Sequence, residues 1–284
     1  MSFQSGGCYR EAGILKRKNM SNRIKKKFET LRAKGKKAFI AFITAGDPSL
    51  KTTEELVLSF EHSGVDIVEL GVPFSDPLAD GPTIQAASQR ALNNGVTLQK
   101  ILDTVRHIRK RSSIPLALMS YYNPIFHYGE KQFMAEAGKA GVDGLIVPDL
   151  PPEEAGSLIK LARQNCIATV FFLSPTTTLK RMKGIVRISD GFIYYVSLTG
   201  VTGARQKLPD TIVKNVKLAK RLTDKPICVG FGISTAAQVK LIAQVADGVI
   251  VGSAIVQEIF KNKGKNNLVR DVSRYVAKLT GALA

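Results

Sequence analysis

The sequence is poor in the residues that form disulfides and bind zinc. Its three cysteines, Cys8, Cys166 and Cys228, are an odd number without close spacing, and its three histidines are scattered along the chain. This pattern argues against a disulfide scaffold and against a zinc site, so we expect no bound metal. It also favours a reducing compartment, and we expect a cytoplasmic location.

Long apolar runs are missing as well. No run approaches the roughly 20 residues that a helix needs to span a bilayer, so we expect a soluble protein with no membrane partner. Of the 284 residues, 44% are hydrophobic, which is enough for the core of one large domain.

Acidic residues are scarce, since 23 of them stand against 41 Lys and Arg, a net charge of +18. Twelve of the basic residues lie between Met1 and Lys37, together with only Glu11 and Glu29. No helix-turn-helix or RNA-binding signature follows them, so we interpret "NRIKKKFETLRAKGKK" as the solvated face of a helix and expect no nucleic-acid partner. Residues 52–89 have the opposite bias, with seven acids and no Lys or Arg.

The first nineteen residues show no hydrophobic periodicity, and we expect residues 1–19 to be a poorly structured extension. A helix is expected to begin directly after Met20, with Ser21 or Asn22 as its N-cap. Residues 20–284 would then form one folded domain.

Eight nearly continuous apolar runs alternate with amphipathic segments from Lys37 onward. Such runs are typical of parallel strands buried on both faces, and their alternation with helices indicates right-handed βαβ units. Eight units predict a closed (β/α)8 TIM barrel with an extra N-terminal helix. An open doubly wound sheet fits less well, because no G-x-G-x-x-G follows the first run. The runs are residues 38–46, 65–73, 115–124, 143–151, 168–175, 191–200, 226–234 and 247–256.

Three short motifs, "SGVD" (63–66), "AGVD" (140–143) and "VADG" (245–248), mark helix ends that turn into strands. Glycine there suits the left-handed position that follows a helix. We assign these motifs a structural role only.

The active site of a barrel lies at the carboxyl ends of its strands. No Lys lies at any predicted strand end, which argues against a Schiff-base aldolase, and no cluster of His and carboxylates suggests a metal-dependent one. Two carboxylates remain in "VELGVPFSDPLADGPTIQ", Glu69 within the second strand and Asp80 in the loop after it. Glu69 has Val68 and Leu70 beside it and should point into the barrel, where desolvation raises a carboxyl pKa toward that of an acid–base catalyst. The structural alternative for Asp80 is that it caps the helix opening at residues 82–83.

Three glycine-containing segments follow the last three strands: "TGVTG" (199–203), "GFGIS" (230–234) and "GSA" (252–254). Glycine lets backbone N–H groups approach a ligand, a helix N-terminus favours an anion, and the last two loops of a barrel are its usual phosphate site. The predicted site therefore has two carboxylates facing a phosphorylated small molecule.

These motifs together resemble the tryptophan synthase alpha chain family. The resemblance runs from about Met20 to the C-terminal helix and includes "TAGDP" (44–48), "YYNPI" (121–125) and "PDLPPEE" (148–154). It implies a barrel enzyme that splits indole-3-glycerol phosphate into indole and glyceraldehyde 3-phosphate.

The resemblance also implies a role for individual residues. Glu69 would be the general acid and base, Asp80 would hold the indole N–H, and Tyr194 would supply a supporting hydroxyl. The two loops 73–82 and 198–207 would close together, with Thr202 bonding Asp80. The phosphate would be bound at Gly203, Gly232, Gly252 and Ser253, and the indole pocket would be lined by Phe231 and Met119.

Alpha chains pair with a beta chain that carries pyridoxal phosphate, and the resemblance implies an alpha2beta2 heterotetramer. The cofactor would belong to the partner, and we expect none in this chain. Asp76, Asn123 and Pro124 match the loops that face the partner.

Three alternatives remain open. A stand-alone lyase that releases free indole would have a very similar sequence. A barrel isomerase of histidine biosynthesis would need Asp at the ends of the first and fifth strands, and although Asp47 suits the first, the fifth ends in Ser174 and Pro175. A degenerate barrel acting as a non-catalytic subunit is opposed by the presence of both Glu69 and Asp80.

Overall fold

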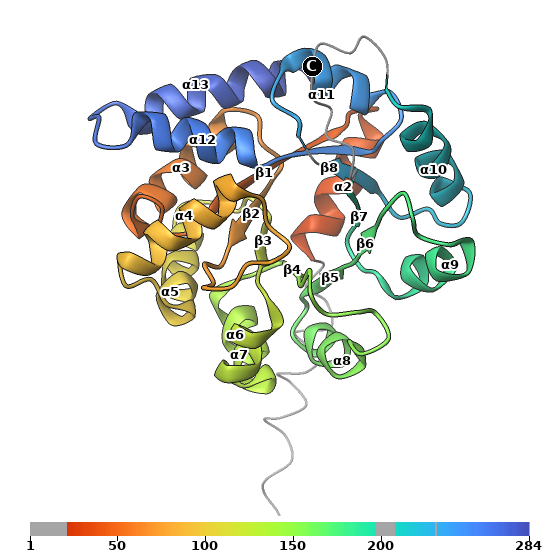
Figure 1. The fold of residues 1–284 in the computed structure, drawn as a ribbon, viewed down its shortest axis with the longest axis horizontal. Coiled ribbons are helices and arrows are strands. Elements are labelled where there is room, and N and C mark those ends of the chain that lie inside the picture. Colours follow the sequence, from red (N-terminus) through yellow and green to blue (C-terminus); the bar gives the residue numbers. More distant parts are fainter. Residues whose placement is uncertain (1–21, 197–207, 231, 284) are drawn as a thin grey trace, which may run out of the picture.

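A ring of parallel strands surrounded by helices forms the centre of the protein in the computed structural model, which describes residues 22–196, 208–230 and 232–283 (Figure 1). The expected extension, residues 1–19, lies outside the described part of the chain. The strands are β1 (Ala38–Thr44), β2 (Ile67–Gly71), β3 (Leu116–Met119), β4 (Gly144–Ile146), β5 (Ala168–Val170), β6 (Phe172–Leu173), β7 (Ile193–Val196), β8 (Ile227–Gly230) and β9 (Gly248–Val251).

All pairings between these strands are parallel, in the order β5-β4-β3-β2-β1-β9-β8-β7-β6. The two edge strands, β5 and β6, are pieces of one extended segment that changes its neighbour from β4 to β7 at Phe171. Tyr194 N donates to Phe171 O at 3.1 Å and Asp190 N to Thr169 O at 2.7 Å, so the ring closes through this segment. Each of the eight predicted runs contains a strand, and the predicted TIM barrel is confirmed.

The described helices surround the outside of the ring, except for the first one, which lies at one end of the ring (Figure 1). They are α2 (Arg23–Ala33), α3 (Leu50–His62), α4 (Pro82–Asn93), α5 (Leu98–Arg109), α6 (Tyr122–Tyr128), α7 (Glu130–Ala140), α8 (Gly156–Gln164), α9 (Leu179–Ile188), α10 (Asp210–Lys220), α11 (Ala236–Ala243), α12 (Ser253–Asn262) and α13 (Leu268–Thr280), with a final 3-10 turn, η1 (Gly281–Leu283).

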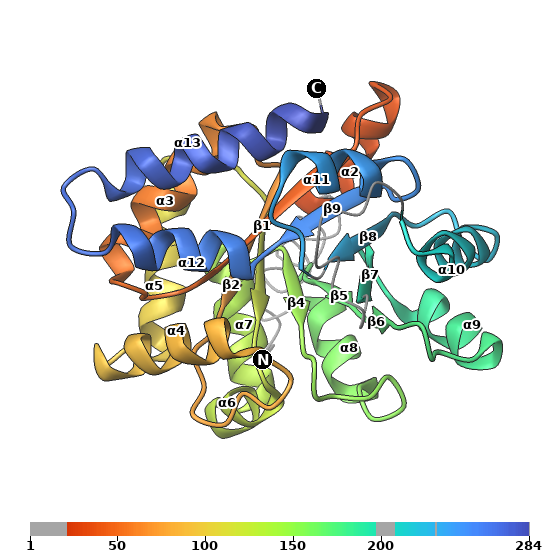
Figure 2. The same ribbon diagram turned by 45° about the horizontal axis from the view of Figure 1, so that its top comes forward.

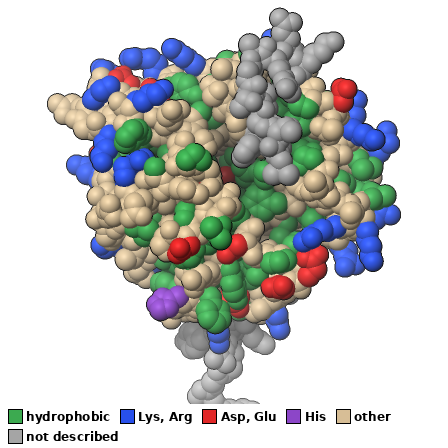
Figure 3. All heavy atoms as spheres, viewed as in Figure 1, with side chains coloured by type: hydrophobic (Ala, Val, Ile, Leu, Met, Phe, Trp, Pro, Cys, Tyr) green, Lys and Arg blue, Asp and Glu red, His purple; other side chains and the backbone are tan. Residues whose placement is uncertain are grey.

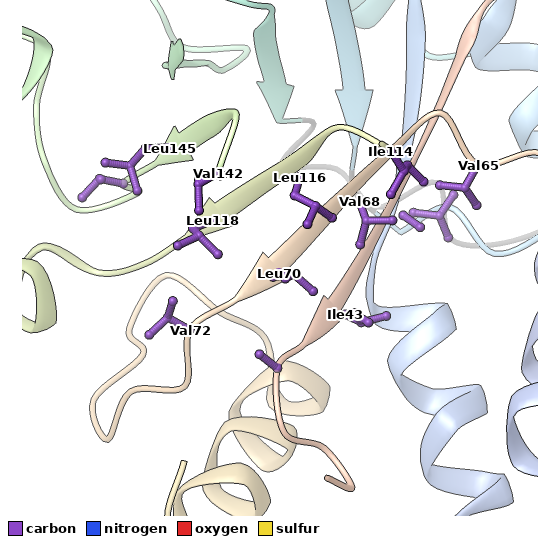
Figure 4. Packing of buried hydrophobic residues seen from close by; sticks show 14 of the residues in the cluster. Ile43, Val65, Val68, Leu70, Val72, Ile114, Leu116, Leu118, Val142 and Leu145 are labelled. Atoms are coloured by element: carbon purple, nitrogen blue, oxygen red, sulfur yellow. The ribbon is translucent and has the colours of Figure 1, made fainter. Parts of the chain in front are cut away.

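The side chains of the strands form two layers. Alternate residues such as Val68, Leu70, Leu116 and Leu118 point outward and pack beneath the helices (Figure 4). Their neighbours point into the barrel, where Ile67 belongs to a separate inner cluster. This alternation is the period of two that a strand buried on both faces requires.

The N-terminal helix α2 closes one end of the barrel (Figures 1 and 2). Its N-cap is Asn22, whose side chain accepts a hydrogen bond from Ile24 N at 3.0 Å; the other expected cap, Ser21, lies outside the described residues. Ile24, Phe28 and Leu31 are buried against the inner layer of the strands. The sequence prediction of a solvated helical face was therefore incomplete, because the opposite face of the same helix fills the barrel.

Three aspartates, each directly before a strand, accept hydrogen bonds from backbone N–H groups of the neighbouring strand. Asp66 accepts a hydrogen bond from Phe39 N at 2.9 Å, Asp143 from Leu116 N at 2.9 Å, and Asp247 from Ile227 N at 3.1 Å. The basic residues of α2 join two of them, since Arg23 pairs with Asp143 at 2.9 Å and Lys27 with Asp66 at 3.5 Å. Part of the basic excess near the N-terminus thus docks α2.

The glycines of the three strand-entry motifs differ. Gly64 and Gly141 have φ values of 84° and 95°, as predicted for residues that end a helix. The prediction was wrong for "VADG", because Gly248 is the first residue of β9. A Cβ atom at this position would lie 2.7 Å from the sulfur of Cys228, so the close packing of the barrel interior requires glycine here.

Replacing Ile24 by Ala should lower the free energy of unfolding by about 2–5 kcal/mol, because it leaves a cavity beneath the inner layer. Urea denaturation measures this difference. Lys25→Ala, on the exposed face of the same helix, is the matched control and should stay within about 0.5 kcal/mol of the parent. Equal stability of the two variants would contradict the role of α2 as a plug.

Candidate active site

A cavity of about 450 Å³ opens at the carboxyl ends of the strands, and we call it the mouth cavity. The face drawn in Figure 3 is hollowed near its centre, where hydrophobic side chains gather, while most Lys and Arg side chains lie toward the edge. The described residues that line the cavity and matter below are Phe42, Asp80, Ile84, Met119, Phe172, Tyr194, Gly232, Ser234, Gly252 and Ser253.

Glu69 is not among the residues that line the mouth cavity, although Phe42, its neighbour on β1, is. It occupies the middle of β2, level with Phe42 on β1 and Ala117 on β3. Val68 and Leu70 belong to the outer cluster, so the Glu69 side chain points into the barrel, as the alternation of residues predicted. It is completely buried.

The environment of Glu69 is apolar. Neither of its carboxyl oxygens has a hydrogen-bond partner within the described residues. Burial without a partner raises the pKa of Glu69 from 4.5 to about 8, because the charged form loses its hydration and gains nothing in exchange. The group is therefore mainly a neutral acid at pH 7. The next residue on the same face is Gly71, where a Cβ atom would lie 2.5 Å from Phe42 Cζ, so glycine here makes room for the Phe42 ring.

Asp80 lies at the edge of the cavity, in the loop between β2 and α4. Its Oδ2 atom accepts a hydrogen bond from the Tyr121 hydroxyl at 3.1 Å. Desolvation raises its pKa, and the Tyr121 hydrogen bond opposes this rise. The capping alternative is wrong, because the N-cap of α4 is Gly81 and no side chain caps that helix.

Tyr194, on β7, reaches the same space from the opposite wall. Its ring centroid lies 5.0 Å from that of Phe172, and a Cβ atom at Gly230 would meet its hydroxyl at 2.7 Å. Glycine at position 230 thus leaves room for this hydroxyl. Burial, followed by the nearby carboxylates Glu69 and Asp80, raises the Tyr194 pKa, so the phenol stays protonated.

The two described glycine segments converge on one end of the cavity. Gly232 has a φ of 67° and lies opposite Gly252 and Ser253, the last being the first residue of α12. The N-terminus of this helix and glycine backbone suit an anion. Ser234 also lines this end, and the sequence prediction did not single it out although it lies within "GFGIS".

The opposite part of the cavity is apolar. Met119 ends β3 and packs against Phe42, Ile84 and the buried Val256. Phe172 was not predicted as a site residue. The apolar run 168–175 does not indicate which of its side chains lines the mouth cavity. Three predicted site residues, Thr202, Gly203 and Phe231, lie outside the described residues.

The residues predicted to face a partner lie outside the cavity. Asp76 is exposed in the β2–α4 loop, Asn123 is exposed on α6, and Pro124 beside it is half-buried. Two large apolar side chains are exposed on the same elements, Leu78 with 91% and Phe126 with 66% of its surface accessible. Exposed apolar residues of this size are typical of a protein–protein contact.

Asp47, the residue that the isomerase alternative required, is held in a structural ion pair. It is 3% exposed, and its carboxylate receives Arg90 Nε at 2.9 Å and Arg90 Nη2 at 2.7 Å. This bidentate pair occupies both carboxylate oxygens and links the β1–α3 loop to α4. Asp47 has no free oxygen for catalysis, which removes the support for that alternative.

The model of one protein family, described as tryptophan synthase alpha chain, matches residues 28–283. The chain belongs to the tryptophan synthase alpha chain family. A curated alpha chain from Geotalea daltonii is 48% identical over 262 residues, which cover 92% of this chain and 99% of that one. One from a Thermoanaerobacter species is 47% identical and covers 92% and 100%.

Solved structures of the family agree with the barrel. A tryptophan synthase subunit alpha from Legionella pneumophila superimposes with a TM-score of 0.86 at 37% identity, covering 93% of this chain and 99% of that chain. A chain from the tryptophan synthase a2b2 complex of Pyrococcus furiosus gives a TM-score of 0.81 at 41% identity and covers 87% and 99%. As a member of the tryptophan synthase alpha family, the chain is a lyase that cleaves indole-3-glycerol phosphate in tryptophan biosynthesis.

The described residues contain neither a membrane-spanning helix nor a metal-binding cluster. No helix there is long and apolar enough to cross a membrane. Within the same residues, no group of three or more His, Cys, Asp or Glu side chains lies close enough together to hold a metal ion.

The raised pKa of Glu69 predicts how stability changes with pH. Between the ordinary pKa of 4.5 and the folded-state value of about 8, the folded protein holds a proton that the unfolded chain has lost. Its stability should therefore fall as pH rises, relative to Glu69→Gln, by up to about 1.4 kcal/mol per pH unit. Urea unfolding of both proteins at pH 5, 6, 7 and 8 measures this slope. A difference between them that does not change with pH would mean that the Glu69 carboxyl is solvated.

Proposed function

We propose that the mouth cavity binds indole-3-glycerol phosphate and that Glu69 is the general acid and base of its cleavage. The observation that carries this proposal is the environment of the Glu69 carboxyl. It is fully buried and has no hydrogen-bond partner within the described residues, and its pKa is raised to about 8. An acid–base group works best when its pKa lies near the working pH.

The two ends of the cavity support one orientation of the substrate. Gly232, Gly252 and Ser253 would bind the phosphate at the N-terminus of α12. Met119, together with Phe42 and Phe172, would enclose the indole ring. The glycerol carbons, where the bond breaks, would then lie between these ends and above Glu69.

The proposed cleavage uses the Glu69 carboxyl twice, first as an acid and then as a base. The Glu69 acid protonates indole C3, and the electrons of the ring place a positive charge on the ring nitrogen. The Glu69 carboxylate then removes the proton of the side-chain hydroxyl, a carbonyl forms, and the carbon–carbon bond breaks. The electron pair of that bond returns to the ring and restores indole, while Glu69 is protonated again.

Asp80 and Tyr194 would support this step electrostatically. The Asp80 carboxylate would accept the indole N–H and balance the positive charge on the ring, which is the charge that develops during the reaction. The Tyr194 phenol would supply a hydroxyl near the Glu69 carboxyl. Glu69 and Tyr194 face each other across the barrel from β2 and β7.

A beta chain is the proposed partner, in an alpha2beta2 heterotetramer. Support comes from the a2b2 complex named for the Pyrococcus furiosus relative, and from the exposed Leu78 and Phe126 beside Asp76, Asn123 and Pro124. Pyridoxal phosphate would belong to that partner. We propose a cytoplasmic location for the assembly, which the small number of cysteines supports.

Glu69→Gln should retain the fold and substrate binding but lose turnover by at least about 10²-fold, because acid–base groups typically contribute 10²–10⁴-fold. The steady-state rate of indole release, with and without a beta chain, is the measurement. Turnover within threefold of the parent would overturn the proposed role of Glu69.

Ser253→Asp should raise KM for indole-3-glycerol phosphate strongly, since it places a negative charge at the proposed phosphate end. Ser253→Asn is the matched control, because Asn has nearly the same size as Asp but carries no charge. We expect the Asp variant to exceed the Asn variant by about tenfold or more in KM, an energy of about 1.4 kcal/mol. Equal KM values for the two variants would place the phosphate elsewhere.

A further inference from the structure

Tyr121 joins two loops at the edge of the mouth cavity. It follows β3, is the N-cap of α6, and is 6% exposed. Its side chain lies against the β2–α4 loop, where its ring centroid is 5.3 Å from that of Phe74. The residues it contacts by hydrogen bonding, Ala79 and Asp80, are about 40 positions away in the chain.

The hydrogen bonds of Tyr121 fix the direction of its proton. Ala79 N–H can only donate, and it donates to the Tyr121 hydroxyl oxygen at 2.8 Å. A phenol has one proton to give, and among the described residues the remaining hydrogen-bond partner is Asp80 Oδ2 at 3.1 Å. The hydroxyl therefore accepts from the backbone and donates to the carboxylate. Oδ2 is engaged, and Oδ1 is the oxygen left to meet a ligand.

We propose that Tyr121 is a positioning residue for Asp80, which holds Oδ2 before substrate arrives and leaves Oδ1 to accept the indole N–H. This inference rests on the role of Asp80 under the proposed function. It adds that the Tyr121 hydroxyl preorganises the Asp80 carboxylate. Preorganised carboxylates stabilise developing charge without reorganising during the reaction.

The charges around Asp80 agree with this role. Donation from Tyr121 favours the ionised carboxylate and lowers the Asp80 pKa against the effect of desolvation. Among the described residues, Tyr194 from β7 interacts electrostatically with Glu69 and with Asp80, and Asp149 interacts electrostatically with Tyr121. Among the described residues, Tyr121 is the only group that donates a hydrogen bond to the Asp80 carboxylate.

The test compares Tyr121→Phe with Tyr122→Phe. The first keeps the ring against Phe74 and removes only the hydroxyl. The second removes an equivalent hydroxyl one residue later, which bonds Glu130 Oε1 at 3.0 Å and is remote from Asp80 in its contacts. Tyr121→Phe should lower kcat about tenfold or more and change KM less than about threefold, while Tyr122→Phe stays within about twofold of the parent.

Two further measurements separate positioning from a general structural effect. In Tyr121→Phe the acid limb of the pH profile of kcat/KM should move to higher pH, because Asp80 becomes harder to ionise. In an Asp80→Asn background, Tyr121→Phe should cause little further loss. Suppose that Asp80→Asn is strongly impaired but still measurable. An unshifted acid limb, additive losses, or a Tyr121→Phe rate within twofold of the parent would then overturn the inference alone. Full activity of Asp80→Asn would overturn the role of Asp80 and the inference together.

Discussion

A closed ring of parallel strands has an interior that side chains must fill, and this constraint determines the rest of the structure. At one end the apolar face of α2 supplies Ile24, Phe28 and Leu31. In the middle the strands supply their own inward residues. At the other end the ring stays open, so that a buried carboxyl, Glu69, lies between a packed core and a cavity.

This position suits the proposed role of Glu69 as both acid and base. An apolar, unpartnered site raises the pKa of Glu69 to about 8, close to neutrality. A basic neighbour would remove that property by stabilising the carboxylate. The absence of Lys and Arg between residues 52 and 89 therefore has a physical consequence at the active site. The hydrogen-bond partner of the Asp80 carboxylate is likewise not a basic group but the neutral Tyr121 hydroxyl.

Basic residues are used at the other end of the barrel. Arg23 and Lys27 of α2 pair with Asp143 and Asp66, whose carboxylates also bind backbone N–H groups of neighbouring strands. The strand-entry motifs thus combine the end of a helix with a fixed contact to the preceding strand. The sequence showed the motifs, but their carboxylate partners became visible only when the strands were placed side by side.

The sequence by itself determined the eight strands, the inward direction of Glu69 and the glycine segments near Ser253. These follow from local patterns, because burial on both faces and the alternation of a strand are recorded in adjacent residues. Only the tertiary structure decided that α2 fills the barrel, that Asp47 is held by Arg90, and that Tyr121 reaches Asp80. Such contacts join residues dozens of positions apart, and their energies depend on ring closure and the exclusion of water, which no local pattern specifies.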